Sequence, residues 1–121
     1  MTLYKIVVVD DEPDLRYIMR RIFERAGHEV TDAGHGVGAL HAVHLSLPDL
    51  VVTDMMMPVM GGAELIRRLR ADPLTARLPI LAATSDILLA GGADAVVAKP
   101  YQPAQLLAAA HTLMTQKAEP T

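Results

Sequence analysis

The chain has 121 residues, of which 51% are hydrophobic and 21% charged, and its net charge is −3 at pH 7. This length and composition favour one folded domain, residues 1–121, and exclude an intrinsically disordered chain. The chain has no cysteine, which excludes disulfides and thiolate metal sites, and its net acidity without a basic block argues against nucleic acid as a direct partner.

Short apolar runs alternate with helical patterns along the chain. Strands are indicated by β-branched or continuous apolar runs, and helices by apolar residues three and four positions apart. Proline and glycine mark several of the boundaries. In chain order the pattern predicts a strand at 6–9, a helix from Pro13 to Gly27, a strand at 29–31, a helix over 37–47, a strand at 50–53, a helix around 65–69, strands at 79–83 and 95–97, and a helix from Pro103.

Strands that alternate with helices are typical of right-handed βαβ units around a parallel sheet. We therefore predict an α/β doubly wound fold with five strands. The sequence shows no repeat and no linker that would divide it. Residues 116–121 are polar, and we expect them to form a flexible tail.

Polar side chains stand where four of the predicted strands end. The first strand is followed by Asp10 and Asp11, the third by Asp54, the fourth by Thr84 and the fifth by Lys99. The carboxyl ends of parallel strands meet at one edge of the sheet, where open α/β folds bind ligands. Three carboxylates held close together need a compensating cation, and Mg²⁺ prefers carboxylates together with phosphate oxygens. We therefore expect one acidic, magnesium-binding crevice.

Asp54 is the candidate nucleophile of this crevice, because a carboxylate can attack a phosphoryl group and hold it as an aspartyl phosphate. The expected metal ligands are Asp10, Asp11, Asp54 and the backbone carbonyl of Met56. Positioning and charge neutralisation supply most of the catalysis in such transfers. The sequence therefore predicts phosphoryl transfer to Asp54.

Lys99 and Thr84 complete the expected crevice. We expect the Lys99 ammonium to pair with Asp54 at rest and with the phosphoryl group afterwards, while the Thr84 hydroxyl donates to a phosphoryl oxygen. Any one of these residues alone could be a strand-end cap or a solvated loop group. The complete set in this order is what indicates a site.

These residues lie in motifs that resemble those of the receiver domains of two-component response regulators, the CheY-like superfamily. The matching segments are 8–13 (VVDDEP), 50–58 (LVVTDMMMP) with Gly62, 79–84 (PILAAT), and the pair Lys99-Pro100. The resemblance covers essentially the whole chain. It implies a flavodoxin-like sheet with strand order 2-1-3-4-5 and a cis peptide bond after the lysine. It also implies Mg²⁺-dependent transfer from a histidine kinase or histidine phosphotransfer protein to Asp54, followed by self-catalysed hydrolysis.

Two departures from the family pattern affect how a signal would leave the site. The family carries an aromatic residue three positions before the lysine, and this aromatic side chain turns inward when the threonine moves. This chain has Val96 at that position. Tyr101 lies nearby, and whether it compensates is open. Only 14 residues separate Thr84 from Lys99, about two helical turns fewer than the family pattern. We therefore expect a fourth helix that is short or absent, and a mobile segment at 85–92.

The expected protein is a signalling switch and not an enzyme with a separate substrate. Its cognate kinase, its downstream target and the presence of an output domain are open, and we expect a monomer or a weak dimer. The first residues lack the shape of a signal peptide, and no apolar stretch approaches the length of a membrane span. We therefore expect a cytoplasmic protein with no membrane partner.

Two other functions compete with this interpretation. A degenerate receiver that binds partners without phosphorylation is favoured by Val96 and the short 85–92 segment, but the intact acidic set argues against it. A Mg²⁺-dependent phosphohydrolase would usually carry a second aspartate two residues after the nucleophile, where this chain has Met56. Such an enzyme would also need a cap domain, for which this chain has no room.

Overall fold

The computed structural model describes residues 2–118 and contains one parallel sheet with helices on both faces. In chain order its elements are β1 (Lys5–Val9), α1 (Pro13–Arg25), β2 (Glu29–Ala33), α2 (Gly36–Ser46), β3 (Leu50–Thr53), α3 (Gly62–Ala71), β4 (Ile80–Thr84), the 3₁₀ turn η1 (Ile87–Leu89), β5 (Ala95–Ala98) and α4 (Pro103–Ala118).

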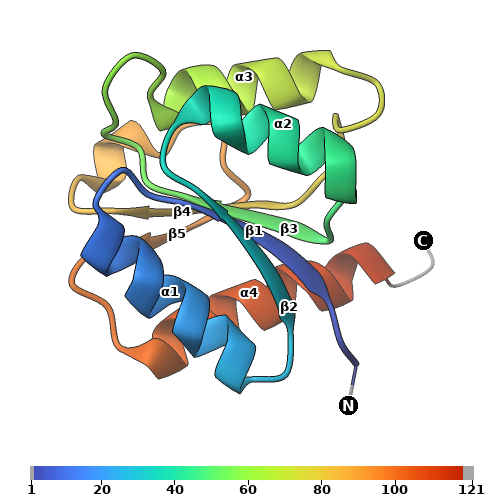
Figure 1. The fold of residues 1–121 in the computed structure, drawn as a ribbon, viewed down its shortest axis with the longest axis vertical. Helices are drawn as coiled ribbons and strands as arrows, with labels where there is room; N and C mark the ends of the chain where they lie inside the picture. The colour runs from blue at the N-terminus through green and yellow to red at the C-terminus, as the bar shows by residue number, and fades with distance from the viewer. Residues whose placement is uncertain (1, 119–121) are drawn as a thin grey trace.

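The strands follow the spatial order β2-β1-β3-β4-β5, and every neighbouring pair is parallel. Figure 1 shows α2 and α3 above the sheet and α1 and α4 below it. The direction of winding reverses between β1 and β3, so the carboxyl ends of these strands flank the crevice in which such folds bind ligands. The predicted doubly wound fold and its strand order are confirmed.

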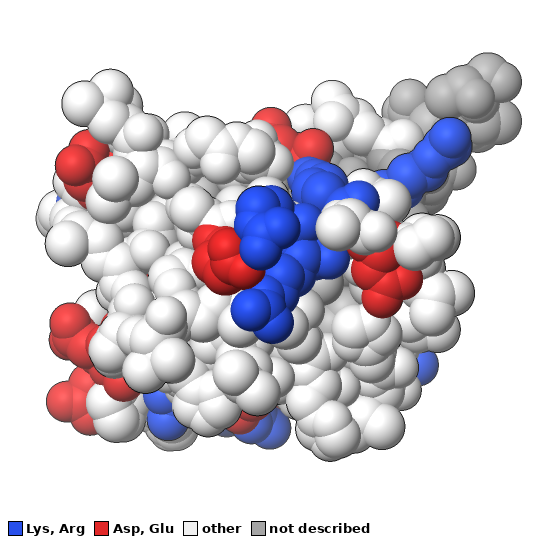
Figure 2. Space-filling view, turned by 90° about the horizontal axis from the view of Figure 1, so that it is seen from above, with Lys and Arg blue, Asp and Glu red and all other residues white. Residues whose placement is uncertain are grey.

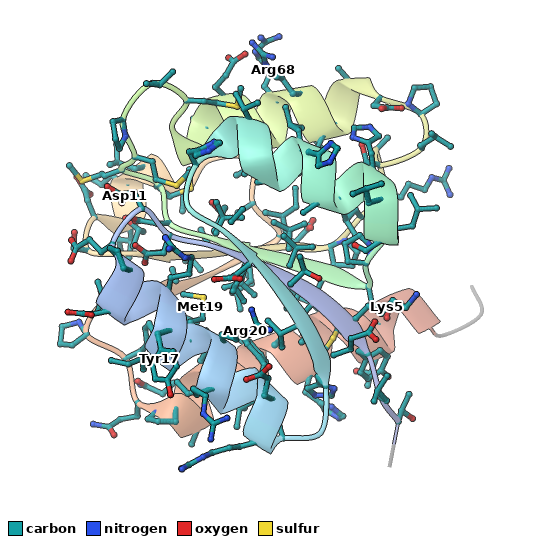
Figure 3. The ribbon with its side chains drawn as sticks, viewed as in Figure 1. Lys5, Asp11, Tyr17, Met19, Arg20 and Arg68 are labelled. Atoms are coloured by element: carbon teal, nitrogen blue, oxygen red, sulfur yellow. The ribbon has the colours of Figure 1, made fainter. Side chains whose placement is uncertain are left out.

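The sheet is buried on both faces because its central strands are apolar throughout. Successive side chains of β1 point in opposite directions: Ile6 and Val8 pack with α1 and α4, whereas Val7 and Val9 pack with α2 and α3. Figure 3 shows Met19 of α1 directed toward the sheet, where it is fully buried. Two apolar layers therefore hold β1 and β3 in place, and with them the loops that follow.

Between β4 and β5 the chain forms only the three-residue turn η1, so the fourth helix of the family pattern is absent, as expected. The Asp86 side chain caps this turn by accepting a hydrogen bond from the Leu88 N–H at 3.0 Å. The few residues available must also carry the chain from one strand end back to the start of the next. That leaves no room for further helical turns.

Some boundaries differ from the predicted ones. β2 extends to Ala33, β4 runs from Ile80 to Thr84, and β5 ends at Ala98. Residues 116–118 belong to α4 and not to a tail, because good helix formers continue the packed helix. The rest of the expected tail, 119–121, lies outside the described residues. Within 2–118, none of the helices is long and apolar enough to cross a bilayer.

Candidate functional site

The carboxyl edge of the sheet gathers the polar residues that the sequence placed at strand ends. Asp10 and Asp11 follow β1, Asp54 follows β3, Thr84 ends β4 and Lys99 follows β5. This edge lies at the left of Figure 1, and Figure 3 shows Asp11 there beside the start of α1. Of the five, Asp10 and Thr84 are completely buried. Residues up to 89 positions apart thus meet in one crevice.

Asp10 is held through both its backbone and its side chain. Its N–H donates to the Ala33 carbonyl at 3.2 Å, and its own carbonyl accepts from Arg16 Nη1 at 2.8 Å. Its Oδ1 accepts from the Glu12 N–H at 3.0 Å, and its Oδ2 accepts from Lys99 Nζ at 2.9 Å. Two partners therefore hold the backbone of Asp10, and two others hold its buried carboxylate.

Lys99 bridges two of the acids, and its closer partner is Asp10. Its Nζ lies 2.9 Å from Asp10 Oδ2 but 3.7 Å from Asp54 Oδ1. The expected pairing of Lys99 with Asp54 is therefore present, but it is the longer of the two contacts. Burial by itself lowers the pKa of Lys99, but the hydrogen bond and negative charge of Asp10 outweigh it, so the pKa is raised. The peptide bond from Lys99 to Pro100 is cis, as the resemblance implied.

Asp54 is 8% exposed, so little of it is accessible to solvent. Its Oδ1 accepts a hydrogen bond from the Met55 N–H at 2.8 Å. Burial raises the pKa of Asp54, and the charge of Lys99 opposes that rise. The backbone amide fixes one carboxylate oxygen, so the side chain is oriented toward the crevice.

Three carboxylates of this crevice could hold one metal ion. Asp10, Asp11 and Asp54 each offer an oxygen, and these oxygens lie within 4.8 Å of one another. An all-oxygen, all-carboxylate set fits a hard divalent cation such as Mg²⁺ better than a soft metal. That the backbone carbonyl of Met56 is a further metal ligand stays a prediction. Met56 is 59% exposed.

Thr84 is buried at the end of β4, and its hydroxyl is engaged with the start of the η1 segment. The hydroxyl donates to the Asp86 carbonyl at 3.3 Å and accepts from the Asp86 N–H at 3.2 Å. The Asp86 side chain is exposed and turned toward η1, where it caps the turn. The contact of Thr84 with a phosphoryl oxygen stays a prediction.

Val96, at the position of the family's aromatic residue, is 42% exposed. Its neighbour Val97 packs in the core formed with α1 and α4, and Tyr101 packs against that same core. Because successive strand residues point to opposite faces, Val96 and Tyr101 lie on opposite sides of the sheet. Tyr101 therefore does not fill the place of the missing ring.

Two contacts that support the crevice were not found from the sequence, although Gly62 itself belongs to the matching motif. Arg16 of α1 donates to the Asp10 carbonyl, and its Nε pairs with Asp32 Oδ2 at 3.1 Å. Gly62 lies so close to the loop that carries Asp54 that an added Cβ would be 2.6 Å from the Asp54 carbonyl oxygen. A residue's distance from a backbone carbonyl leaves no pattern in the sequence, so neither role could be predicted.

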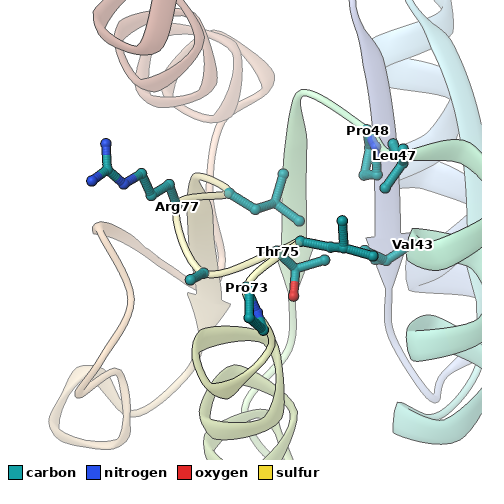
Figure 4. Close-up of a pocket in the computed structure, with 9 residues that line it drawn as sticks. Val43, Leu47, Pro48, Pro73, Thr75 and Arg77 are labelled. Carbon is teal, nitrogen blue, oxygen red and sulfur yellow. The ribbon is translucent and has the colours of Figure 1, made fainter.

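Other surface features lie away from the crevice. A cavity of about 340 Å³ lies at the amino ends of β3 and β4, and Figure 4 shows that Arg77 extends away from its other labelled residues. Figure 2, seen from the side of α2 and α3, shows a group of basic side chains with acidic side chains beside it. On α3, Glu64 pairs with both Arg67 and Arg68. These charges therefore neutralise each other in part.

Residues 6–111 match the model of the response regulator receiver domain. The phosphate regulon transcriptional regulatory protein PhoB of Rhizobium meliloti (strain 1021) is 39% identical over 125 residues, which cover 98% of this chain and 55% of PhoB. The chain thus spans about half the length of that relative.

Two solved structures illustrate the similarity of fold. The chemotaxis response regulator CheY4 of Vibrio cholerae has a TM-score of 0.84 and 28% identity, over 93% of this chain and 99% of CheY4. The receiver domain of the sensor histidine kinase PA1611 of Pseudomonas aeruginosa PAO1 has a TM-score of 0.88 and 25% identity, over 94% and 99% of the two chains. That structure has a magnesium ion coordinated in its active-site cleft.

Proposed function

Because this chain belongs to the response regulator receiver domain family, we propose that Asp54 is its phosphoacceptor and that a histidine kinase or histidine phosphotransfer protein is the donor. The observation that carries this proposal is the geometry of the Asp54 carboxylate. It is largely buried, lies within 4.8 Å of ligand oxygens of Asp10 and Asp11, and has the Lys99 ammonium 3.7 Å away.

In the proposed transfer, a carboxylate oxygen of Asp54 attacks the phosphorus atom of the donor's phosphohistidine. A new O–P bond forms, the P–N bond breaks, and its electron pair returns to the donor's imidazole. Mg²⁺, held by Asp10, Asp11 and Asp54, would supply positive charge for the phosphoryl oxygens. Lys99, directly after β5, supplies a second positive charge, and Asp10 holds its ammonium at 2.9 Å.

The rim of the crevice suits contact with a protein donor. A cavity of about 540 Å³ lies beside Asp11 and is lined in part by Val37, Pro58 and Val59. Val37 is 58% exposed and Val59 is fully exposed. An exposed apolar rim beside a reactive group is typical of a surface that another protein covers. A donor that reaches Asp54 would contact this rim.

The proposal is tested by intact mass after incubation with acetyl phosphate. Asp54 would attack phosphorus and acetate would leave, so the chain should gain the mass of one phosphoryl group when Mg²⁺ is present. We expect no gain with a chelator and no gain in Asp54→Asn. Asp14→Asn, which changes an exposed carboxylate in the first turn of α1, should still gain the group.

Fast hydrolysis could hide the product, so the same samples are titrated with beryllofluoride, a phosphoryl mimic. Amide shifts around Asp54 in the parent and in Asp14→Asn, but not in Asp54→Asn, support the proposal. An unmodified parent that also shows no shift with beryllofluoride would contradict it.

A second candidate is a partner-binding module that works without phosphorylation. The absence of the fourth helix and the presence of Val96 favour it, because the family's usual route from site to surface is missing. It predicts equal target binding by the parent and Asp54→Asn, with or without acetyl phosphate. That this chain binds no nucleic acid itself also stays a prediction, although PhoB is named a transcriptional regulatory protein.

A further inference from the structure

The imidazole of His44 joins two elements at the end of the molecule opposite the acidic crevice. His44 lies in the last turn of α2, and Asp72 directly follows α3 and begins the α3–β4 loop, residues 72–79. Nε2 of His44 is 2.8 Å from Asp72 Oδ2, and its Nδ1 is 2.7 Å from the Leu40 carbonyl oxygen. Within residues 2–118, no other hydrogen bond or ion pair joins α2 to α3 or to this loop.

Both ring nitrogens of His44 face acceptors, an arrangement that only the protonated ring can satisfy. The carbonyl oxygen of Leu40 cannot donate a hydrogen bond. The Asp72 carboxylate also accepts from the Leu74 N–H at 3.0 Å, and the hydrogen bonds from His44 and Leu74 lower the pKa of Asp72, so it is ionised. A neutral imidazole carries one N–H and could serve only one of the two partners. The observed geometry is therefore that of the imidazolium.

Asp72 is the charged group on which the protonation of His44 depends. The hydrogen bond to Asp72, followed by that to the Leu40 carbonyl, raises the pKa of His44. Helix α2 packs against β1, β2 and α3, and the other charged or titratable groups around it are bound elsewhere or exposed. Those bound elsewhere are Glu64 with Arg67 and Arg68, Arg70 with Asp94, Asp32 with Arg16 and Arg20, and Asp49 with the Lys5 N–H, and those exposed are Lys5, Glu29, His41 and Arg77.

The same contact joins the two walls of the cavity of about 340 Å³ at the amino ends of β3 and β4. One wall is the end of α2 with Val43, and the other is the loop from Pro73 to Leu78 (Figure 4). His44 directly follows Val43 in the chain, and Asp72 directly precedes Pro73. The ion pair therefore ties one wall of the cavity to the other.

We propose that His44 and Asp72 form a pH-dependent clasp on this cavity, which holds the α3–β4 loop against α2 when His44 is charged and lets the loop open locally when His44 is neutral. The neutral ring must turn a lone pair toward either the Asp72 carboxylate or the Leu40 carbonyl, and repulsion in both cases weakens the clasp. Because the pKa of His44 is raised in the folded chain, the clasp is complete below about pH 6.5 and is lost as the pH rises through the folded value.

The loop has separate contacts with its own helix, so its opening does not require α3 to unfold. Thr75 Oγ1 donates to the Leu69 carbonyl at 2.6 Å, and Arg70 Nη1 donates to the Leu78 carbonyl at 2.7 Å. Neither contact includes a histidine. Release of the clasp should therefore separate the loop from α2 and leave the strands unchanged.

The test is hydrogen exchange of the full chain at about pH 5.5 and about pH 8, expressed as protection factors so that the intrinsic pH dependence of exchange is removed. The reporter amides are those of Leu74, Thr75 and Leu78, whose N–H groups bond within the loop. Their protection in the parent should fall about threefold between the two pH values, the size expected when one exposed ion pair is lost. Amides of residues 51–53 in β3 report any change in global stability and should lose less protection.

Three variants at exposed positions separate the clasp from other effects of pH. His44→Lys keeps a cation at both pH values, so the loop should stay protected at both. His44→Leu removes the cation, so the loop should be open at both. His41→Leu changes an exposed histidine three positions earlier on α2 and should follow the parent. A magnetic-resonance titration of the His44 ring should have the same midpoint as the change in loop protection.

Two outcomes would overturn the proposal. One is a parent whose protection at residues 74–78 does not depend on pH beyond the change seen in β3. The other is an equal dependence on pH in the parent and in His44→Leu.

Discussion

The guanidinium of Arg16 donates to the backbone carbonyl of Asp10 at 2.8 Å and so ties the first helix to the acidic crevice. The same side chain reaches Asp32 of β2 through its Nε. Arg16 lies against Gly34, where an added Cβ would be 2.9 Å from Arg16 Nη1. Helix α1, the end of β1 and the end of β2 are thus joined at the point where Asp10 enters the site.

Because Arg16 holds the Asp10 backbone, we expect Arg16→Met to weaken Mg²⁺ binding by about tenfold, the lower end of what loss of a supporting group costs a metal site. Arg20→Met is the matched control, since Arg20 also pairs with Asp32 but does not contact Asp10 in the structure. Calorimetric titration with Mg²⁺ measures both variants, and urea unfolding shows whether stability changed as well. Equal Mg²⁺ affinities for Arg16→Met and Arg20→Met would contradict the role of Arg16.

Val59 is fully exposed and has a φ of 69°, in the left-handed region that β-branched residues rarely adopt. Glycine adopts this conformation without steric cost, although it loses more entropy on folding. We expect Val59→Gly to raise the free energy of unfolding by about 1 kcal/mol, measured by urea denaturation. Val37→Gly is the control, because Val37 is also exposed but helical, and it should lower stability by about 0.5 kcal/mol, the difference between valine and glycine in a helix.

Gly62 begins α3 directly against the loop that carries Asp54. A Cβ there would lie 2.6 Å from the Asp54 carbonyl oxygen and 2.8 Å from Met55 Cα, and backbone atoms cannot move aside cheaply. Gly62→Ala should therefore cost about 1–3 kcal/mol of stability, the usual range for overpacking, and should slow phosphorylation by acetyl phosphate. Gly91→Ala meets no atom within 4 Å and should leave both quantities close to those of the parent.

The lowered pKa of His28 predicts that the folded chain loses stability in mild acid. Burial and the charge of His111 lower the pKa of His28 below its ordinary 6.5, and its Nδ1 accepts from the Tyr4 N–H at 3.2 Å. A group whose folded pKa is depressed is protonated more readily in the unfolded chain, so its protonation favours unfolding. The free energy of unfolding should fall as the pH drops below about 6.5, and His28→Gln should reduce that fall.

His44 provides the opposite control for the same experiment. Its hydrogen bond to Asp72, at 2.8 Å, raises the pKa of His44 and lowers that of Asp72. Because the pKa of His44 is raised, its stabilising contribution is complete below pH 6.5. That contribution is lost as the pH rises through the pKa of His44 in the folded chain. The contribution of Asp72, whose pKa is lowered, is lost only in strong acid. His44→Gln should therefore destabilise the chain more at pH 5.5 than at pH 8. Identical pH profiles for the two variants would contradict both assignments.

The order of strands and helices along the chain follows from the sequence, because period and composition are local properties of the chain. The sequence also places particular side chains at the strand ends, and parallel strands must bring those ends to one edge. Asp10, Asp11, Asp54, Thr84 and Lys99 were predicted together for that reason. The missing helix followed from a simple count of the residues between Thr84 and Lys99.

The contacts among the members of the site could be read only from the folded chain. Lys99 lies nearer Asp10 than Asp54, and Arg16 reaches a backbone carbonyl, because such distances depend on how separate elements pack. The strained backbone of Val59 and the open edge of β5 are likewise absent from any local pattern. Periodicity gives the direction of a side chain relative to its own element, and only packing in three dimensions gives its neighbours.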